Sequence, residues 1–387
     1  MEIRRGKKDE FYTIIDFIDF VFSKAHEPHD FLKLYANLYL ETDESMHNMI
    51  NMWDGGQIVG SILSLPRTMV VGGKALQVCG IGSVACHPRM GGKGIMSRLM
   101  TYNNEEMRKD GVHLACLGGR RSRYNHFGYE EGGTNFSAEV SASAMQARLP
   151  DYDGSRYAFV PFSMKDREML NACHALYNSK PIHYDYTPEE FFLRLTIPCC
   201  GAKPFAIQKD GEFCGYVSYS DASKLNIVEM TLCDDNDSAD VMLTLAAQHK
   251  KTVTIDLYEY QLPDFRPIAD VGSLLGMDGS GMWKVLDWKS VLEALLTFKA
   301  SYMTLPEGTL VLTLGDTTYS ITLRDGIADV AETAQSPDFS FGELEAVSAL
   351  TSPVTQSYFG LCGDLTKMTL ARSWFPLPLS RLFAERV

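Results

Sequence analysis

The first third of the chain alternates apolar and polar residues over long stretches, a pattern typical of β-strands. Two such runs, residues 57–71 and 76–86, flank the pair Gly72-Gly73, which indicates a hairpin turn. Upstream, residues 11–24 and 30–40 are rich in Phe and Tyr and predict helices. The chain is therefore expected to begin with helices and to continue as a long hairpin.

A glycine-rich turn then leads into a predicted helix over residues 92–109. Ile95, Leu99 and Tyr102 fall on one face of that helix, at the spacing of a face that packs on a core. A short strand is expected next, over residues 112–117. Hairpin, helix and strand in this order predict a mixed α/β sheet.

The middle of the chain partly repeats this order. After a predicted helix near 163–177, a hairpin is expected over residues 204–219 and a strand near 224–233. A helix near 238–249 and a strand over 252–257 follow. The repetition predicts a second copy of the same sheet.

The turn between strand and helix differs in this second copy. It reads Cys233-Asp-Asp-Asn-Asp-Ser238, with several carboxylates and no glycine. Such a turn would repel phosphate, so the second copy is expected to be a scaffold with an inactive nucleotide-type site.

The last quarter of the chain has a third pattern. A helix near 289–299 precedes alternating apolar positions in residues 310–314 and 319–323, which predict a small antiparallel sheet. Helices near 342–350 and 363–372 are expected to cover it. The whole pattern predicts an α/β (α+β) chain of three domains, with the residue ranges 1–148, 149–284 and 285–387.

The formal net charge of −13 disfavours nucleic acid and anionic lipid surfaces as partners. It favours cationic substrates weakly, and solubility alone also explains it. No segment resembles a signal peptide or a membrane span, and the nine cysteines are scattered without a CxxC pair. We therefore expect a cytoplasmic protein with reduced thiols and no metal.

The first chemical signal is the junction from Val84 to Met100, where a strand feeds a glycine turn and the turn feeds a helix. Free backbone N–H groups and a helix N-terminus attract an anion such as a pyrophosphate. Lys93 and Arg98 add positive charge, although a flexible connection would use the same glycines. The turn lacks the Gly-Lys-Ser/Thr ending of a Walker A loop.

This junction resembles the acetyl-CoA motif of the GNAT superfamily of N-acetyltransferases, Arg/Gln-x-x-Gly-x-Gly/Ala. Gly94 matches the central glycine, whereas Gly91 stands where Arg or Gln is usual and Met96 where a small residue is usual. The resemblance implies acetyl-CoA as the co-substrate. The residues that it implies for acetyl-CoA binding are Val84, Ala85, Cys86, Gly91, Gly92, Lys93, Gly94, Ile95 and Met96.

A second motif, Tyr124-Asn-His-Phe-Gly-Tyr129, is similar to the Tyr-x-x-Phe-Gly-Tyr sequence of GNAT proteins. The resemblance implies that Tyr124 is the general acid that protonates the CoA thiolate, and a packing role at a helix end is the alternative. It also implies direct transfer without an acyl-enzyme, so Cys86 is interpreted as a strand residue. Phe127 and Tyr129 are expected in the core.

The whole chain resembles the enhanced intracellular survival (Eis) type of this superfamily. That type has a catalytic GNAT domain, a second, degenerate GNAT-like domain and a sterol-carrier-protein-like domain, which correspond to the three ranges above. It implies a homo-oligomer, often a hexamer, and acetyl transfer to a primary amine of a small acceptor.

In the Eis type the chain's own terminal carboxylate, here Val387, acts as the base. Glu385, His26, Glu27 and His29 are the alternatives. A different reading of the whole chain is a non-catalytic binding or scaffolding protein with a decayed acetyl-CoA site. The acceptor stays open among aminoglycosides, polyamines, peptide lysines and other small amines.

Overall fold

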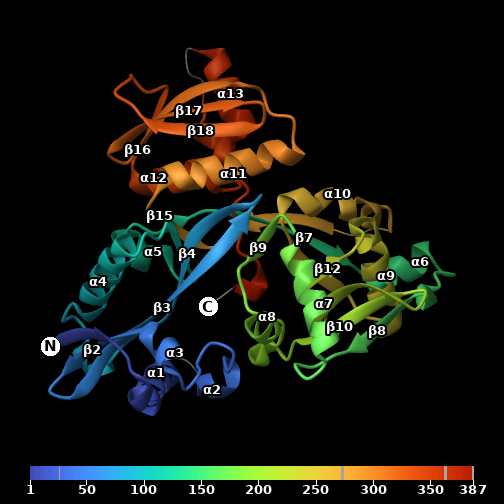
Figure 1. Ribbon diagram of the computed structural model, residues 1–387, viewed down its shortest axis with the longest axis horizontal. Coiled ribbons are helices and arrows are strands. Elements are labelled where there is room, and N and C mark those ends of the chain that lie inside the picture. Colours follow the sequence, from blue (N-terminus) through green and yellow to red (C-terminus); the bar gives the residue numbers. More distant parts are fainter. Residues whose placement is uncertain (26, 272–273, 361–363, 386–387) are drawn as a thin grey trace. The chain divides into compact units, whose positions relative to one another are not determined.

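The computed structural model describes residues 1–25, 27–271, 274–360 and 364–385 of the chain. His26 and Val387, both proposed above as the base, lie outside the described residues. The described chain falls into two compact units. The first unit comprises residues 1–133 and 279–379, and the second comprises residues 134–278 and 380–385. Each contains mixed α/β structure, as the sequence predicts (Figure 1).

The first unit contains a long mixed sheet with the strand order β1-β2-β3-β4-β5-β15-β6. Its strands are β1 (Glu2–Arg5), β2 (Met49–Asp54), β3 (Gln57–Val71), β4 (Lys74–Cys86), β5 (Leu114–Leu117), β6 (Glu130–Glu131) and β15 (Met282–Val285). The predicted hairpin is confirmed, because β3 and β4 pair antiparallel around Gly72-Gly73. Strands β4 and β5 are parallel and are joined through helix α4 (Ile95–Lys109), which is the predicted helix.

Two apolar clusters cover this sheet. One gathers Ile95 and Leu99 of α4 with residues of β4 and β5, and both of these side chains are almost fully buried. The other gathers aromatic residues of α1 (Phe11–Ala25) and α2 (Phe31–Leu34) against β2, β3 and β4. The strands are thus fixed in place by burial on both faces.

The predicted helix over residues 30–40 is wrong beyond Leu34. Asp30 caps α2 by accepting a hydrogen bond from the backbone N–H of Lys33, at 3.1 Å. The chain then leaves the helix and folds back, so that the Phe31 and Tyr39 rings meet edge to face at 5.6 Å. Tyr39 is 4% exposed, and burying this ring outweighs the small gain from a further helical turn.

The second unit contains a mixed sheet with the order β14-β7-β13-β12-β11-β10-β8. Its strands are β7 (Thr134–Val140), β8 (Tyr157–Pro161), β10 (Lys203–Lys209), β11 (Glu212–Asp221), β12 (Leu225–Leu232), β13 (Val253–Leu257) and β14 (Leu274–Gly279). As in the first sheet, a hairpin leads to a strand, and a helix, α9 (Ser238–His249), connects that strand to a parallel neighbour. The predicted repetition of order is confirmed. Helices α7 (Arg167–Asn178) and α8 (Pro188–Leu195) belong to the same unit.

A third sheet lies in the first unit, with the order β18-β17-β16-β19. Its strands are β16 (Gly308–Leu314), β17 (Thr317–Arg324), β18 (Ile327–Glu332) and β19 (Phe339–Phe341). Helix α11 (Trp288–Tyr302) lies along β18, where Thr297 accepts a hydrogen bond from the Ala328 N–H at 3.0 Å. Helices α12 (Glu343–Thr351) and α13 (Leu365–Trp374) fall where the sequence predicts helices.

The strand pairing crosses the boundaries predicted near residues 148 and 284. Strand β7 pairs with β13 in the second sheet, and β15 lies between β5 and β6 in the first. Each sheet therefore takes a strand from across a predicted boundary, and the division into three domains stays a prediction.

Gly128 tests the packing between β15 and the segment that follows β5. Its φ is +86°, and an added Cβ would lie 2.0 Å from Nζ of Lys284, which pairs with Glu343 at 2.6 Å. Gly73 has nearly the same φ, +83°, with nothing within 4 Å. We expect Gly73→Ala to cost about 1–2 kcal/mol of unfolding free energy through its backbone alone. We expect Gly128→Ala to cost about 1–3 kcal/mol more through overpacking.

Urea unfolding of the two variants checks this difference, because the backbone cost cancels between them. Equal losses of unfolding free energy would mean that the Lys284 side chain moves aside freely. The extra cost expected for Gly128→Ala would then be wrong.

Candidate active site

The candidate site is centred on the point where β5 ends and β4 continues. The two strands pair in parallel from Val78 opposite Leu114 to Ile81 opposite Leu117, where β5 ends. Strand β4 continues to Cys86, paired on its other side with β3. Beyond Ile81, the edge of β4 that faced β5 therefore has no strand partner among the described residues. Backbone N–H and C=O groups on this edge are available to an extended ligand.

A β-bulge changes the direction of β4 at this opening. The β3–β4 register shifts after Ser61, and Ser83 has a φ of +44°, which is rare for a residue with a side chain. The Ser83 hydroxyl shares a hydrogen bond with the buried Tyr39 hydroxyl. The aromatic N-terminal segment thus holds the bulge in place.

The residues after the bulge face two different clusters. Val84 and Cys86 pack with the cluster beside α4, whereas Ala85 is fully buried among the aromatic residues of α1 and α2. The end of β4 therefore separates two compartments, one next to the glycine turn and one lined by aromatic rings.

The glycine turn is exposed and leads directly into α4. Gly92 and Gly94 have φ values of +75° and +70°, so both use the left-handed conformation that favours glycine. Gly91 has an ordinary φ of −56°, and its conformation does not require glycine. Gly94 is the N-cap of α4, so the N–H groups of the first turn, including those of Ile95 and Met96, have no acceptor within the helix.

Two cations lie close to these N–H groups. Lys93 and Arg98 are exposed, and in the part of the chain that the structure describes neither has a carboxylate partner. Free N–H groups, a helix N-terminus and unpaired cations together make a site for a phosphate group. The turn is therefore suited to a phosphate group, and its role in binding acetyl-CoA stays a prediction.

Tyr124 lies at the end of the short helix α5 (Arg121–Tyr124) and is 6% exposed. Its ring packs on Gly119, where an added Cβ would lie 2.4 Å from a ring carbon, so only glycine leaves room for it. It belongs to the same cluster as Cys86 and Met96, which places the phenol on the glycine-turn side of β4. The loop after it is held by Asn104, whose side chain donates to the Phe127 carbonyl at 3.1 Å.

Burial raises the pKa of Tyr124 above its ordinary value, and the charge of Arg123 opposes the shift only partly. The phenol is therefore neutral and carries a proton at physiological pH. Burial also raises the pKa of the Cys86 thiol, so the nucleophilic thiolate is disfavoured. This agrees with the interpretation of Cys86 as a strand residue.

The aromatic compartment contains a carboxylate that the sequence reasoning missed. Asp19 of α1 is half-buried, and burial raises its pKa. One of its oxygens accepts a hydrogen bond from the Phe31 N–H at 2.8 Å. The only signal in the sequence is that Asp19 interrupts the apolar run of residues 17–22 in α1.

The other N-terminal candidates are less suited to act as a base. Glu27 is exposed, and its carbonyl lies 2.7 Å from Nδ1 of His29, whose ring stacks at a tilt on Phe31. Neither the exposed carboxylate nor this imidazole is directed by a described contact to the open edge of β4. Asp19 differs from them in being partly buried beside the aromatic compartment, with a pKa that burial raises.

Glu385 is engaged in the second unit. Its carboxylate accepts hydrogen bonds from the Tyr186 hydroxyl, at 2.6 Å, and from Arg194. The side chain is 2% exposed, so it serves to hold the tail segment on that unit.

No group of three or more His, Cys, Asp or Glu side chains in the described ranges is arranged to hold a metal ion. In the same ranges, no helix has both the length and the apolar character needed to cross a bilayer.

Comparison with known proteins agrees with this fold and site. Residues 2–132 match the family model described as the acetyltransferase (GNAT) domain. An uncharacterized N-acetyltransferase of Streptomyces avermitilis is 27% identical over 181 residues, which are 46% of this chain. The aligned part is 42% of that relative's length, less than half of it.

Solved structures resemble nearly the whole chain. A GCN5-related N-acetyltransferase of Anabaena variabilis has a TM-score of 0.70 at 15% identity, and the match covers 97% of each chain. Eis1 of Mycobacterium abscessus has a TM-score of 0.68 at 13% identity and is matched over 100% of both chains. At these identities the likeness establishes the shared fold.

Proposed function

We propose that this chain is an acetyl-CoA-dependent N-acetyltransferase that moves acetyl directly to a primary amine of a small, cationic acceptor. The proposal rests on three features that lie together in the first unit: an unpaired strand edge, a glycine turn and a buried tyrosine. The open edge of β4 ends in a glycine turn at the start of α4, and the neutral, buried Tyr124 packs in the same cluster as Cys86 and Met96.

This part of the protein offers a surface that matches acetyl-CoA. The pyrophosphate of acetyl-CoA would accept from the N–H groups of Gly92, Gly94, Ile95 and Met96, with the Lys93 side chain nearby. Gly91, in the position where relatives carry Arg or Gln, supplies only its backbone. The pantetheine arm, which contains amides, would pair with the open edge of Val84, Ala85 and Cys86 as an added strand does.

The reaction follows from few parts. The neutral amine nitrogen attacks the thioester carbon, a C–N bond forms, and the C–S bond breaks. Backbone N–H groups of β4 would stabilise the oxyanion, and Tyr124 would give its proton to the departing sulfur. An alkyl amine has a pKa of about 10.4, so a base must take its proton.

For the base we propose the terminal carboxylate of Val387, as in the Eis type. Asp19 is the second candidate, favoured by its hydrogen bond from the Phe31 N–H beside the aromatic compartment and by a pKa that burial raises. A carboxylate among aromatic rings also suits a cationic acceptor, since both attract ammonium groups.

The assignment to a particular type of GNAT protein rests on the similarity in fold to Eis1. We propose that the chain is of the Eis type, that it works in the cytoplasm as a homo-oligomer, a hexamer by resemblance, and that residues 285–387 form a sterol-carrier-like domain. The sheet β16–β19 with its covering helices supports this last assignment.

Binding of acetyl-CoA is the first test. At a free concentration about a hundredfold above the dissociation constant, acetyl-CoA should add about 2.7 kcal/mol to the unfolding free energy and raise the thermal midpoint. Gly94→Leu should abolish this shift, because a side chain would cover the N–H groups of α4. Gly111→Leu is the matched control: Gly111 has a φ of +69° and lies just after the other end of the helix.

A shift that survives Gly94→Leu would place the cofactor elsewhere. Absence of any shift in the unchanged protein would favour the alternative, a scaffolding protein with a decayed site.

Tyr124→Phe tests the general acid. We expect kcat to fall about 10²- to 10⁴-fold, while stabilisation by acetyl-CoA is kept. An acid must be protonated, and the pKa of Tyr124 is raised, so wild-type kcat should be limited on the alkaline side only above about pH 10. Tyr129→Phe is the control, because the Tyr129 hydroxyl is buried in the same cluster without a hydrogen-bond partner among the described residues.

Steady-state kinetics over a range of pH separate the two tyrosines. If both variants keep full kcat, Tyr124 only packs, and another donor protonates the thiolate.

Deletion of Val387 tests the base. We expect kcat to fall at least about 10²-fold with acetyl-CoA binding unchanged, since the terminal carboxylate is displaced. Asp19→Asn, measured in parallel, should leave most of kcat and mainly raise KM for a cationic acceptor. The reverse pattern, a loss of kcat in Asp19→Asn alone, would assign the base to Asp19.

A further inference from the structure

A hollow of about 410 Å³ lies at the C-terminal end of helix α11, beside the turn that joins β17 to β18. It is lined by residues 300–305, Glu307, Leu323 and Gly326, all of which belong to the first unit. An added Cβ on Gly326 would lie 4.0 Å from the Cβ of Ala300. The turn and the last turn of α11 therefore face each other across the opening.

The lining of this hollow is largely apolar. Leu305 and Leu323 contribute to it, and Met303 is 41% exposed. The Tyr302 ring, which also lines it, packs at 5.2 Å on the Phe298 ring of the same helix. Apolar side chains exposed around a concave surface are typical of a ligand site.

Glu307 is the one charged residue among the described residues that line the hollow. Its Oε1 atom accepts a hydrogen bond from the Asp325 N–H at 2.8 Å, which fixes the carboxylate at the turn bordering the opening. The carbonyl groups at the end of α11 add a partial negative charge, because the dipole of a helix is negative at its C-terminus. Both features attract a cation.

The nearest basic side chains on these elements lie elsewhere. Lys299 of α11 is buried and donates to the Pro376 carbonyl at 2.8 Å. Arg324 is exposed and follows Leu323 in β17, so its side chain lies on the opposite face of the strand. Neither belongs to the described lining residues. The hollow therefore has negative charge and an apolar surface together.

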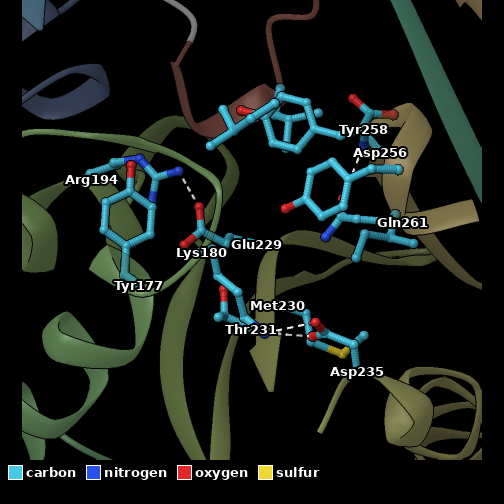
Figure 2. A pocket seen from close by; sticks show the side chains of 14 residues that line it. Tyr177, Lys180, Arg194, Glu229, Met230, Thr231, Asp235, Asp256, Tyr258 and Gln261 are labelled. Carbon is cyan, nitrogen blue, oxygen red and sulfur yellow. Dashed lines mark hydrogen bonds and ion pairs between the residues drawn. The ribbon is translucent and has the colours of Figure 1, made fainter. Parts of the chain in front are cut away.

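The pocket of the second unit differs in this respect. Figure 2 shows Lys180 joined to Asp235 and Arg194 joined to Glu229. These charged groups neutralise one another within the protein. Glu307, by contrast, has no cationic partner in the part of the chain that the structure describes.

We propose that the hollow at the end of α11 binds a small, soluble quaternary ammonium compound. Its methyl groups contact the apolar lining, and its positive charge lies beside the Glu307 carboxylate and the carbonyl groups of α11. A quaternary nitrogen has no N–H groups that need acceptors, and its weakly hydrated surface suits an apolar site with aromatic character. Such a nitrogen cannot accept an acetyl group, so this site is separate from acetyl transfer.

Choline and its neutral carbon analogue, in which a carbon atom replaces the nitrogen, form the test pair. They have nearly the same shape and differ in charge. Ligand-observed NMR titration of the full chain should give choline at least about fivefold tighter binding, as expected for a cation beside a carboxylate and an aromatic ring at an exposed site.

Two variants test the two features of the hollow. Glu307→Gln keeps an acceptor for the Asp325 N–H, so the turn should stay in place. It should weaken choline binding about three- to fivefold and leave the neutral analogue unchanged. Ala300→Leu should fill the opening and weaken both compounds at least about fivefold.

Asp316→Asn is the matched control, because it makes the same charge change at the exposed turn between β16 and β17. It should leave both affinities unchanged. An equal loss of choline affinity in Asp316→Asn and Glu307→Gln would mean that the overall surface charge attracts the cation, and the proposal would be wrong. Equal affinity for choline and its neutral analogue would overturn it as well.

Asp19→Asn distinguishes this hollow from the proposed acceptor site. Choline binding that is lost in Asp19→Asn and unaffected by Glu307→Gln would place the ligand in the aromatic compartment and overturn the proposal. None of these results bears on acetyl-CoA binding, which is measured independently.

Discussion

The unpaired edge of β4 is the constraint on which the rest of the first unit's site depends. A central strand of a mixed sheet normally has both edges satisfied, yet the ladder with β5 stops at Ile81 while β4 runs on to Cys86. Backbone groups on that edge need water or a ligand. An extended amide-bearing chain meets this need in the way a further strand would. The glycine turn begins where the edge ends, so a strand-like surface and an anion site are continuous in the sequence.

The position of the edge is set from the far side of the sheet. The bulge at Ser83 exists in a conformation that a serine rarely adopts, and the hydrogen bond with Tyr39 links it to the aromatic cluster. Burial of Tyr39 therefore acts on the geometry of β4. The compartment that would hold the acceptor and the strand that would hold the cofactor meet at this bond and at the buried Ala85, so one packing arrangement would align the two substrates.

The local sequence pattern predicted many of the helices, strands and turns. Contacts between distant segments could not be predicted from it. The glycine turn and α4 follow from neighbouring residues, and so do the hairpin around Gly72-Gly73 and the order of elements in both sheets. The insertion of β15 between β5 and β6 joins segments that lie far apart in the sequence, as in the pairing of Met282 with Leu117, which no periodicity records. The end of α2 at Leu34 depends on where Tyr39 is buried, and helical spacing cannot show that.

The same limit applies to the charged groups. Asp19 was visible as an acidic residue in an apolar run, but its contact with Phe31 was not. Arg194, Glu229 and Glu385 come from distant parts of the chain, and each alone is an ordinary charged residue. Assembled and buried, they form an ion-paired cluster that links α8, β12 and the segment around Glu385. Burying three charges is costly unless they are paired, so the exposed acidic turn before α9 and this buried cluster have different roles. The turn disfavours a phosphate, and the cluster holds the segment around Glu385 on the second unit.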